Sequence, residues 1–118
     1  MNKYEEILEW IKAGTDHLIV AMLAIMYYVI QAEGMSAEHL TDIMTKISMS
    51  FNTSTNILTS GETTYTINDL LHTTITTLYP KSMVITPEFI LFSLYKLKRY
   101  SYITAEQYTT LKSELANA

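Results

Sequence analysis

Apolar side chains recur every three to four positions through most of the chain, which is the spacing that places them on one face of an α-helix. This spacing predicts helices over residues 3–13, 37–51, 67–79, 87–100 and 105–115. Segment 16–33 is apolar on nearly every side, a pattern typical of a helix surrounded by other helices. The pattern therefore predicts an all-α fold, an irregular bundle of five to six helices around a central apolar helix, in one helical domain over residues 1–118.

The predicted helix starts share a chemical pattern, in which a Ser or Thr side chain can accept a hydrogen bond from an amide of the first turn. Thr104 is followed three residues later by Gln107, which can return a second hydrogen bond and complete a capping box. Thr86 precedes Pro87, whose fixed φ suits the first helical position, and Ser36 marks a third start. The predicted helix ends are marked by residues that terminate helices readily: Gly14, Gly34 and Pro80.

Residues 52–65 interrupt the helical pattern because they are rich in Thr, Ser and Asn, whose side chains compete for backbone groups in a helix. Apolar residues on both sides of Ser60 and Gly61 allow a small β-hairpin near residues 56–67, whereas a flexible loop explains the composition equally well. Both alternatives stand at this point. The Thr-rich segment 73–77 weakens the helix predicted there, since β-branched side chains lose rotamer freedom in a helix.

The composition narrows the class of protein. The chain of 118 residues is 48% hydrophobic and 17% charged, which is compatible with a folded domain. It has no cysteine, which excludes disulfide scaffolds, zinc–thiolate sites and cysteine nucleophiles. Its net charge of −4 argues against general nucleic-acid binding, because such binding requires a basic surface.

The longest apolar run, Leu18–Ile30, is shorter than the ~20 residues that a membrane-spanning helix needs. It follows an acidic segment, whereas a signal peptide begins with basic residues. We therefore expect a buried helix, no insertion into a membrane and a cytoplasmic location.

The residues that could support catalysis do not form a recognisable motif. The three histidines, His17, His39 and His72, never stand four residues apart, which is the spacing of a helical metal-binding pair. His39 and His72 each lie three residues from an aspartate, Asp42 and Asp69, and such pairs are usually ordinary helix-surface contacts. The three glycines lie too far apart for a phosphate-binding loop. We therefore predict no catalytic residue, no cofactor and no metal, in a protein that is not an enzyme.

A concentrated group of cations and tyrosines lies near the end of the helix predicted over residues 87–100. We call it the basic–tyrosine cluster, and it consists of Tyr95, Lys96, Lys98, Arg99, Tyr100 and Tyr102. Cations in a last helical turn complement the negative end of the helix dipole, which is the simpler interpretation. Cations among tyrosines can also contact phosphates and stack on bases, or bind an acidic protein surface. We take this cluster as the predicted partner-binding site.

The same helix has more apolar residues than one buried stripe requires. They are Phe89, Ile90, Leu91, Phe92, Leu94, Tyr95 and Leu97. A helix that is apolar on more than one face is either central in its fold or packed on a second chain. We therefore expect this surface to contact another protein, and a homodimer is one form of that contact.

Segment 94–115 resembles the short C-terminal helical hairpin called SHOCT. The matching positions are Ile103, Thr104, Glu106, Tyr108, Leu111 and Leu115. That family usually has a glycine in the turn, where this chain has Ser101 and Tyr102 instead. The resemblance covers under a fifth of the chain, and it implies an element for interaction or oligomerisation, not an active site.

Two main classes of function remain. The first is a small non-catalytic protein-binding module, an inhibitor or adaptor of the kind that phages and mobile elements encode, which includes anti-CRISPR and other anti-defence proteins. The second is a DNA-binding regulator with a winged-helix-like core, in which the third helix reads the major groove and residues 56–67 form the wing. Against the second class, the third helix has a single cation, Lys46, with Glu38 and Asp42 beside it. A helical bundle like that of bacteriocin-immunity proteins is a third option.

Overall fold

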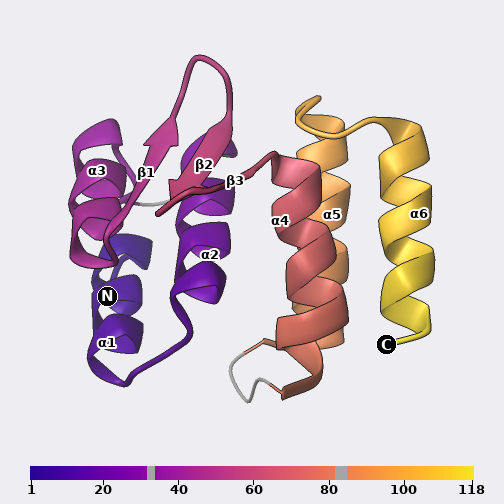
Figure 1. The fold of residues 1–118 in the computed structure, drawn as a ribbon, viewed down its shortest axis with the longest axis horizontal. Coiled ribbons are helices and arrows are strands. Elements are labelled where there is room, and N and C mark those ends of the chain that lie inside the picture. Colours follow the sequence, from indigo (N-terminus) through magenta and orange to yellow (C-terminus); the bar gives the residue numbers. More distant parts are fainter. Residues whose placement is uncertain (32–33, 82–84) are drawn as a thin grey trace. The chain divides into compact units, whose positions relative to one another are not determined.

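The computed structural model describes residues 1–31, 34–81 and 85–118. Within these residues the chain is mostly helical, with six α-helices and one three-stranded antiparallel sheet. The chain divides into two compact units, residues 1–66 and residues 67–118, which are coloured indigo to magenta and orange to yellow in Figure 1. The predicted helical class is confirmed at this level, while the arrangement around a central helix and the single domain stay predictions.

The first unit begins with three helices, α1 (Lys3–Lys12), α2 (His17–Val29) and α3 (Ala37–Lys46). Helix α1 packs on both α2 and α3, and α2 packs on α3. Most of the side chains of α2 are buried, as its apolar sequence predicts. Helix α2 ends at Val29 and not at residue 33, because Gln31 adopts a left-handed φ of 54°. Residues 32 and 33 lie outside the described part of the chain.

Three strands follow: β1 (Met49–Asn52), β2 (Ile57–Ser60) and β3 (Thr63–Tyr65), paired in the order β1-β2-β3. Of the two alternatives left open by the sequence, the structure has the hairpin and not the loop, with Gly61 and Glu62 between β2 and β3, one residue later than Ser60 and Gly61. Buried Leu58 lies opposite Phe51 on β1 and Tyr65 on β3.

The helix predicted over residues 37–51 is wrong beyond Lys46. Ser48 adopts a left-handed φ of 58°, which ends the helix, and the chain continues as β1. The apolar residues Met49 and Phe51 fit a strand because their spacing of two places them on one face of the sheet. Pairing with β2 then supplies the backbone hydrogen bonds of this segment.

The second unit contains α4 (Ile67–Thr73), α5 (Pro87–Arg99) and α6 (Ala105–Ala116). Helix α6 packs on both α5 and α4. The predicted helix over residues 67–79 is helical but irregular, because α4 continues as a π-helical turn over Thr74–Leu78 and a 3₁₀ turn over Tyr79–Lys81. Pro80 therefore lies within a helical turn and does not end the helical segment.

The predicted helix starts are confirmed in atomic detail. The Thr104 side chain accepts a hydrogen bond from the Gln107 amide at 3.0 Å, and the Gln107 side chain accepts one from the Thr104 amide at 2.9 Å. The side chains of Thr86 and Ser36 likewise accept hydrogen bonds from amides three residues later. The helices that position the candidate site therefore begin where local chemistry places them.

Candidate functional site

Helix α5 presents one buried face and one exposed face. Ile90, Ser93, Leu94 and Leu97 are buried, and their spacing of three, one and three residues makes a single stripe along the helix. The opposite face is exposed to solvent, and it carries large apolar side chains. The cap at Thr86 and Pro87 fixes where α5 begins, and packing on α6 determines which of its residues stay exposed.

The exposed face of α5 is unusual in its chemistry. The described residues include five exposed large hydrophobic side chains, and one of them is the first residue of the chain. The other four belong to α5 and its C-cap, and we call them the α5 patch: Leu91 (38% exposed), Phe92 (45%), Tyr95 (45%) and Tyr100 (47%). Apolar and aromatic groups gathered on one surface are typical of a protein interface.

Cations of the basic–tyrosine cluster lie against these rings. The Lys96 ammonium lies 5.5 Å from the centroid of the Phe92 ring. The Lys98 ammonium lies 4.2 Å from the Tyr108 centroid on α6 and 5.8 Å from the Tyr95 centroid. Such cation–π contacts hold an ammonium group over an aromatic face without neutralising its charge.

The cations of the two units differ in their partners. Each lysine of the first unit forms an ion pair on its own helix, with N–O distances of 3.2 Å for Lys3–Glu6, 3.6 Å for Lys12–Glu9 and 2.6 Å for Lys46–Asp42. Within the described part of the chain, Lys96, Lys98 and Arg99 form no ion pair. The C-terminal end of α5 therefore presents positive charge that forms no ion pair with a carboxylate of the described residues.

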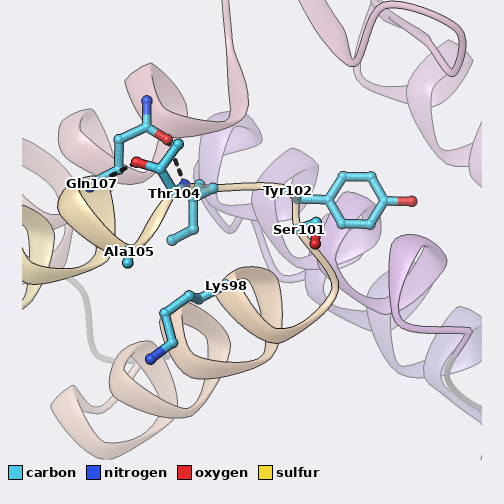
Figure 2. A pocket seen from close by; sticks show the side chains of 7 residues that line it. Lys98, Ser101, Tyr102, Thr104, Ala105 and Gln107 are labelled. Atoms are coloured by element: carbon cyan, nitrogen blue, oxygen red, sulfur yellow. Dashed lines mark hydrogen bonds between the residues drawn. The ribbon is translucent and has the colours of Figure 1, made fainter.

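The structure divides the basic–tyrosine cluster into two groups. Tyr95, Arg99 and Tyr100 are exposed, whereas Lys98 and Tyr102 are half-buried and line a pocket of ≈ 450 Å³ between the end of α5 and the start of α6. Figure 2 shows the Lys98 side chain leaving α5 and the Tyr102 side chain leaving the turn that follows, and the two point away from each other. Lys96, the sixth residue of the cluster, is half-buried and lies outside this pocket, and Lys98 joins the two groups through its contact with the Tyr95 ring.

One row of residues along the exposed face of α5 was not predicted as a separate surface. Glu88, Phe92, Tyr95 and Arg99 follow one another at spacings of four, three and four residues, which is the repeat that keeps side chains on a single helix face. We call these four residues the α5 stripe. The repeat was visible in the sequence, but so was the buried stripe, and only packing shows which stripe the fold covers.

Two histidine rings bond to groups that the spacing of three residues did not predict. The His39 ring donates from Nδ1 to the carbonyl of Gly34 at 2.5 Å, since a carbonyl can only accept, and it stacks on the Tyr4 ring with centroids 3.9 Å apart. His72 lies 2.8 Å from a carboxylate oxygen of Glu114 on α6. No group of three or more potential metal ligands occurs among the described residues.

Three titratable groups with shifted pKa values, Tyr4, Asp42 and Lys46, join α1 to α3. The Tyr4 hydroxyl donates to Asp42 Oδ2 at 2.5 Å, and Lys46 donates to Asp42 Oδ1 at 2.6 Å. Hydrogen bonds from Lys46 and Tyr4 lower the pKa of Asp42, while the hydrogen bond to Asp42 raises the pKa of Tyr4. A tyrosine with a raised pKa is harder to ionise, so this cluster supports packing between helices better than it supports base catalysis.

No family model, curated protein or solved structure matches this chain. In the part of the chain that the structure describes, every helix is too short or too polar to cross a membrane.

Proposed function

We propose that this chain is a small non-catalytic protein-binding module, and that it acts as an inhibitor or adaptor through the exposed face of α5. The observation that supports the proposal is the α5 patch, where aromatic rings lie beside Lys96 and Lys98, and where exposed Arg99 ends the same helix. Aromatic residues and arginine are the side chains that most often dominate binding energy at protein interfaces. The chain's net charge of −4 favours a protein partner over nucleic acid.

The resemblance to SHOCT supports the same proposal. Helices α5 and α6 pack on each other, and a short turn joins them. Ser101, which stands where that family usually has glycine, adopts a left-handed φ of 67°. A hairpin of this kind, acting as an interaction element, would present the α5 patch from a rigid support.

Site-specific photo-crosslinking tests the proposal. A photoreactive amino acid replaces Phe92 on α5, and in a matched control it replaces Thr110, an exposed residue of α6. In cells of the source organism we expect a discrete crosslinked polypeptide from position 92, much less from position 110, and loss of the product when Arg99→Glu is added. Absence of any protein crosslink from position 92, copies of the chain itself included, would contradict the proposal.

A DNA-binding regulator is the second candidate, and the order of elements in the first unit favours it. Three helices are followed directly by antiparallel strands, as in winged-helix proteins, with α3 as the reading helix. The electrostatics disfavour it, because Lys46 on α3 is paired with Asp42, and Glu38 adds a further negative charge. Electrophoretic mobility of duplex DNA at low salt tests it. We expect no shift. Salt-sensitive DNA binding that is lost in Lys46→Glu would instead support a DNA-binding regulator that reads DNA with α3.

A further inference from the structure

The α5 stripe has an order of charges that makes it complementary to itself. Glu88 lies in the first turn of α5, Arg99 is its last residue, and Phe92 and Tyr95 lie between them. The spacing of four, three and four residues is that of the a and d positions along a coiled-coil seam. In α5 this seam is exposed, because the buried residues of the helix occupy its opposite face.

The stripe is also symmetric about the middle of the helix. Glu88 and Arg99 are equally far from the midpoint between residues 93 and 94, and so are Phe92 and Tyr95. When two copies of α5 pack antiparallel about a two-fold axis, Phe92 of one copy meets Tyr95 of the other. The same axis brings Glu88 of each copy to Arg99 of its partner, at both ends of the seam.

We propose that a second copy of this chain docks on the α5 stripe and forms a two-fold symmetric dimer through antiparallel α5 helices. The inference rests on the proposed function, since it takes the same face of α5 as the binding surface and names its partner. Charge complementarity selects this partner. Neither Glu88 nor Arg99 has an ion pair among the described residues. In the dimer, the carboxylate of Glu88 in each copy can pair with the oppositely charged Arg99 of the other copy.

The size of the seam sets the strength of the dimer. From Glu88 to Arg99 the helix spans about 16 Å, at 1.5 Å per residue, so that each copy contributes roughly three turns. A single pair of such helices buries less surface than a standard stable interface, which is roughly 1,600 Å² in total. The dimer is therefore weak and depends on concentration, with a dissociation constant in the micromolar range or above.

Charge reversal at the two ends of the seam tests the dimer. Glu88→Arg places two arginines together at each end, and Arg99→Glu places two glutamates together there. We expect each variant alone to associate at least about tenfold more weakly than the original chain, because like charges oppose each other at both ends. An equimolar mixture of the two variants pairs each arginine with a glutamate, so we expect the mixture to regain the dimer as a heterodimer.

Sedimentation equilibrium over a range of concentrations measures the average mass. Lys112→Glu, a reversal at an exposed position of α6, is the matched control and should dimerise like the original chain. Circular dichroism shows whether each variant remains helical, and recovery in the mixture shows that neither variant has lost its fold.

Three results would overturn the dimer. They are an average mass equal to that of a single chain at every concentration, a dimer that persists in both charge-reversal variants, or a mixture of the two variants that forms no heterodimer. The photo-crosslinking experiment separates these failures from failure of the proposed function. A crosslink from position 92 to a different protein, in a chain that stays monomeric, would refute the dimer and leave the protein-binding function standing. Binding of vesicles rich in anionic lipid, lost in Arg99→Glu, would instead assign the stripe to a membrane surface and overturn both.

Discussion

Ser101 and Gly14 occupy the same position in two copies of one helix-ending motif. Each is the residue after a helix C-cap, with a left-handed φ of 67° for Ser101 and 82° for Gly14. In both, the residue's own amide and the next amide bond back to carbonyls of the last turn; the second bond is 2.8 Å for Tyr102–Leu97 and 3.1 Å for Thr15–Trp10. Glycine adopts this conformation without strain, whereas serine does not.

The first prediction is that Ser101→Gly stabilises the protein. Removing the side chain relieves the left-handed backbone, which costs a non-glycine residue roughly 1 kcal/mol. We expect the free energy of unfolding in urea to rise by about 0.5–1 kcal/mol. The matched control is Gly14→Ser, which should lower it by a similar amount because no atom lies within 4 Å of the added Cβ. Equal stability of the Ser101→Gly variant and the original chain would show that the strain is absorbed elsewhere.

Gly34 faces a second constraint besides its φ of 74°. A Cβ built on Gly34 would lie 2.7 Å from Cγ of Asn2, whose side chain caps α1 by accepting from the Glu5 amide. We predict that Gly34→Ala destabilises the protein by about 1 kcal/mol more than Gly14→Ala, since the cap must move as well as the backbone. Thermal unfolding of the two variants side by side measures this difference. Similar losses in both would mean that Asn2 moves aside without losing its cap.

Thr104→Ala should destabilise the second unit. The substitution removes the acceptor for the Gln107 amide and breaks the capping box of α6, at a cost of about 1 kcal/mol. Thr109→Ala, in the interior of the same helix, is the control. Its hydroxyl bonds to the Ala105 carbonyl, which already accepts a helical hydrogen bond, so alanine should be neutral there. Urea unfolding, monitored by circular dichroism, measures the stability of both variants. Equal free energies of unfolding would show that the cap does not stabilise α6.

The contact between Tyr4 and Asp42 predicts a dependence of stability on pH at both extremes. The pKa of Asp42 is lowered in the folded chain, chiefly by its hydrogen bond from Lys46, so its contribution is present above the ordinary aspartate pKa and is lost as pH falls below it. The pKa of Tyr4 is raised by its hydrogen bond to Asp42, so its contribution is present below the ordinary tyrosine pKa and is lost at higher pH.

Melting temperatures of the original chain, Asp42→Asn and Tyr4→Phe measured across the pH range test this linkage. The deficit of Asp42→Asn should be largest near neutral pH and should shrink in acid, where the original chain loses the same charge. Tyr4→Phe should abolish the part of the alkaline loss that comes from Tyr4. A deficit that stays constant at every pH would indicate a packing defect and not a loss of charge.

Local chemistry was enough to predict the helix starts. The signals at Thr104, Thr86 and Ser36 act over three or four residues, so each is complete within the sequence that carries it, and the structure confirms all three. The exposed cations and aromatic residues of α5 were visible for the same reason. The sequence did not show which of these residues stay exposed. When a helix has two apolar stripes, its own sequence does not indicate which stripe the rest of the chain covers.

Tertiary structure decided the features that depend on distant residues. Phe51 has an apolar neighbour at helical spacing, but it lies in a strand because Leu58 pairs opposite it. The His72 ring forms a hydrogen bond with Glu114, forty-two residues away in the sequence. Contacts between residues so far apart in the sequence form only when the whole unit folds. Closing the long loop between them costs entropy, and no local sequence pattern shows whether that cost is met. The sequence by itself therefore determined where helices begin, and the fold determined which faces remain open to a partner.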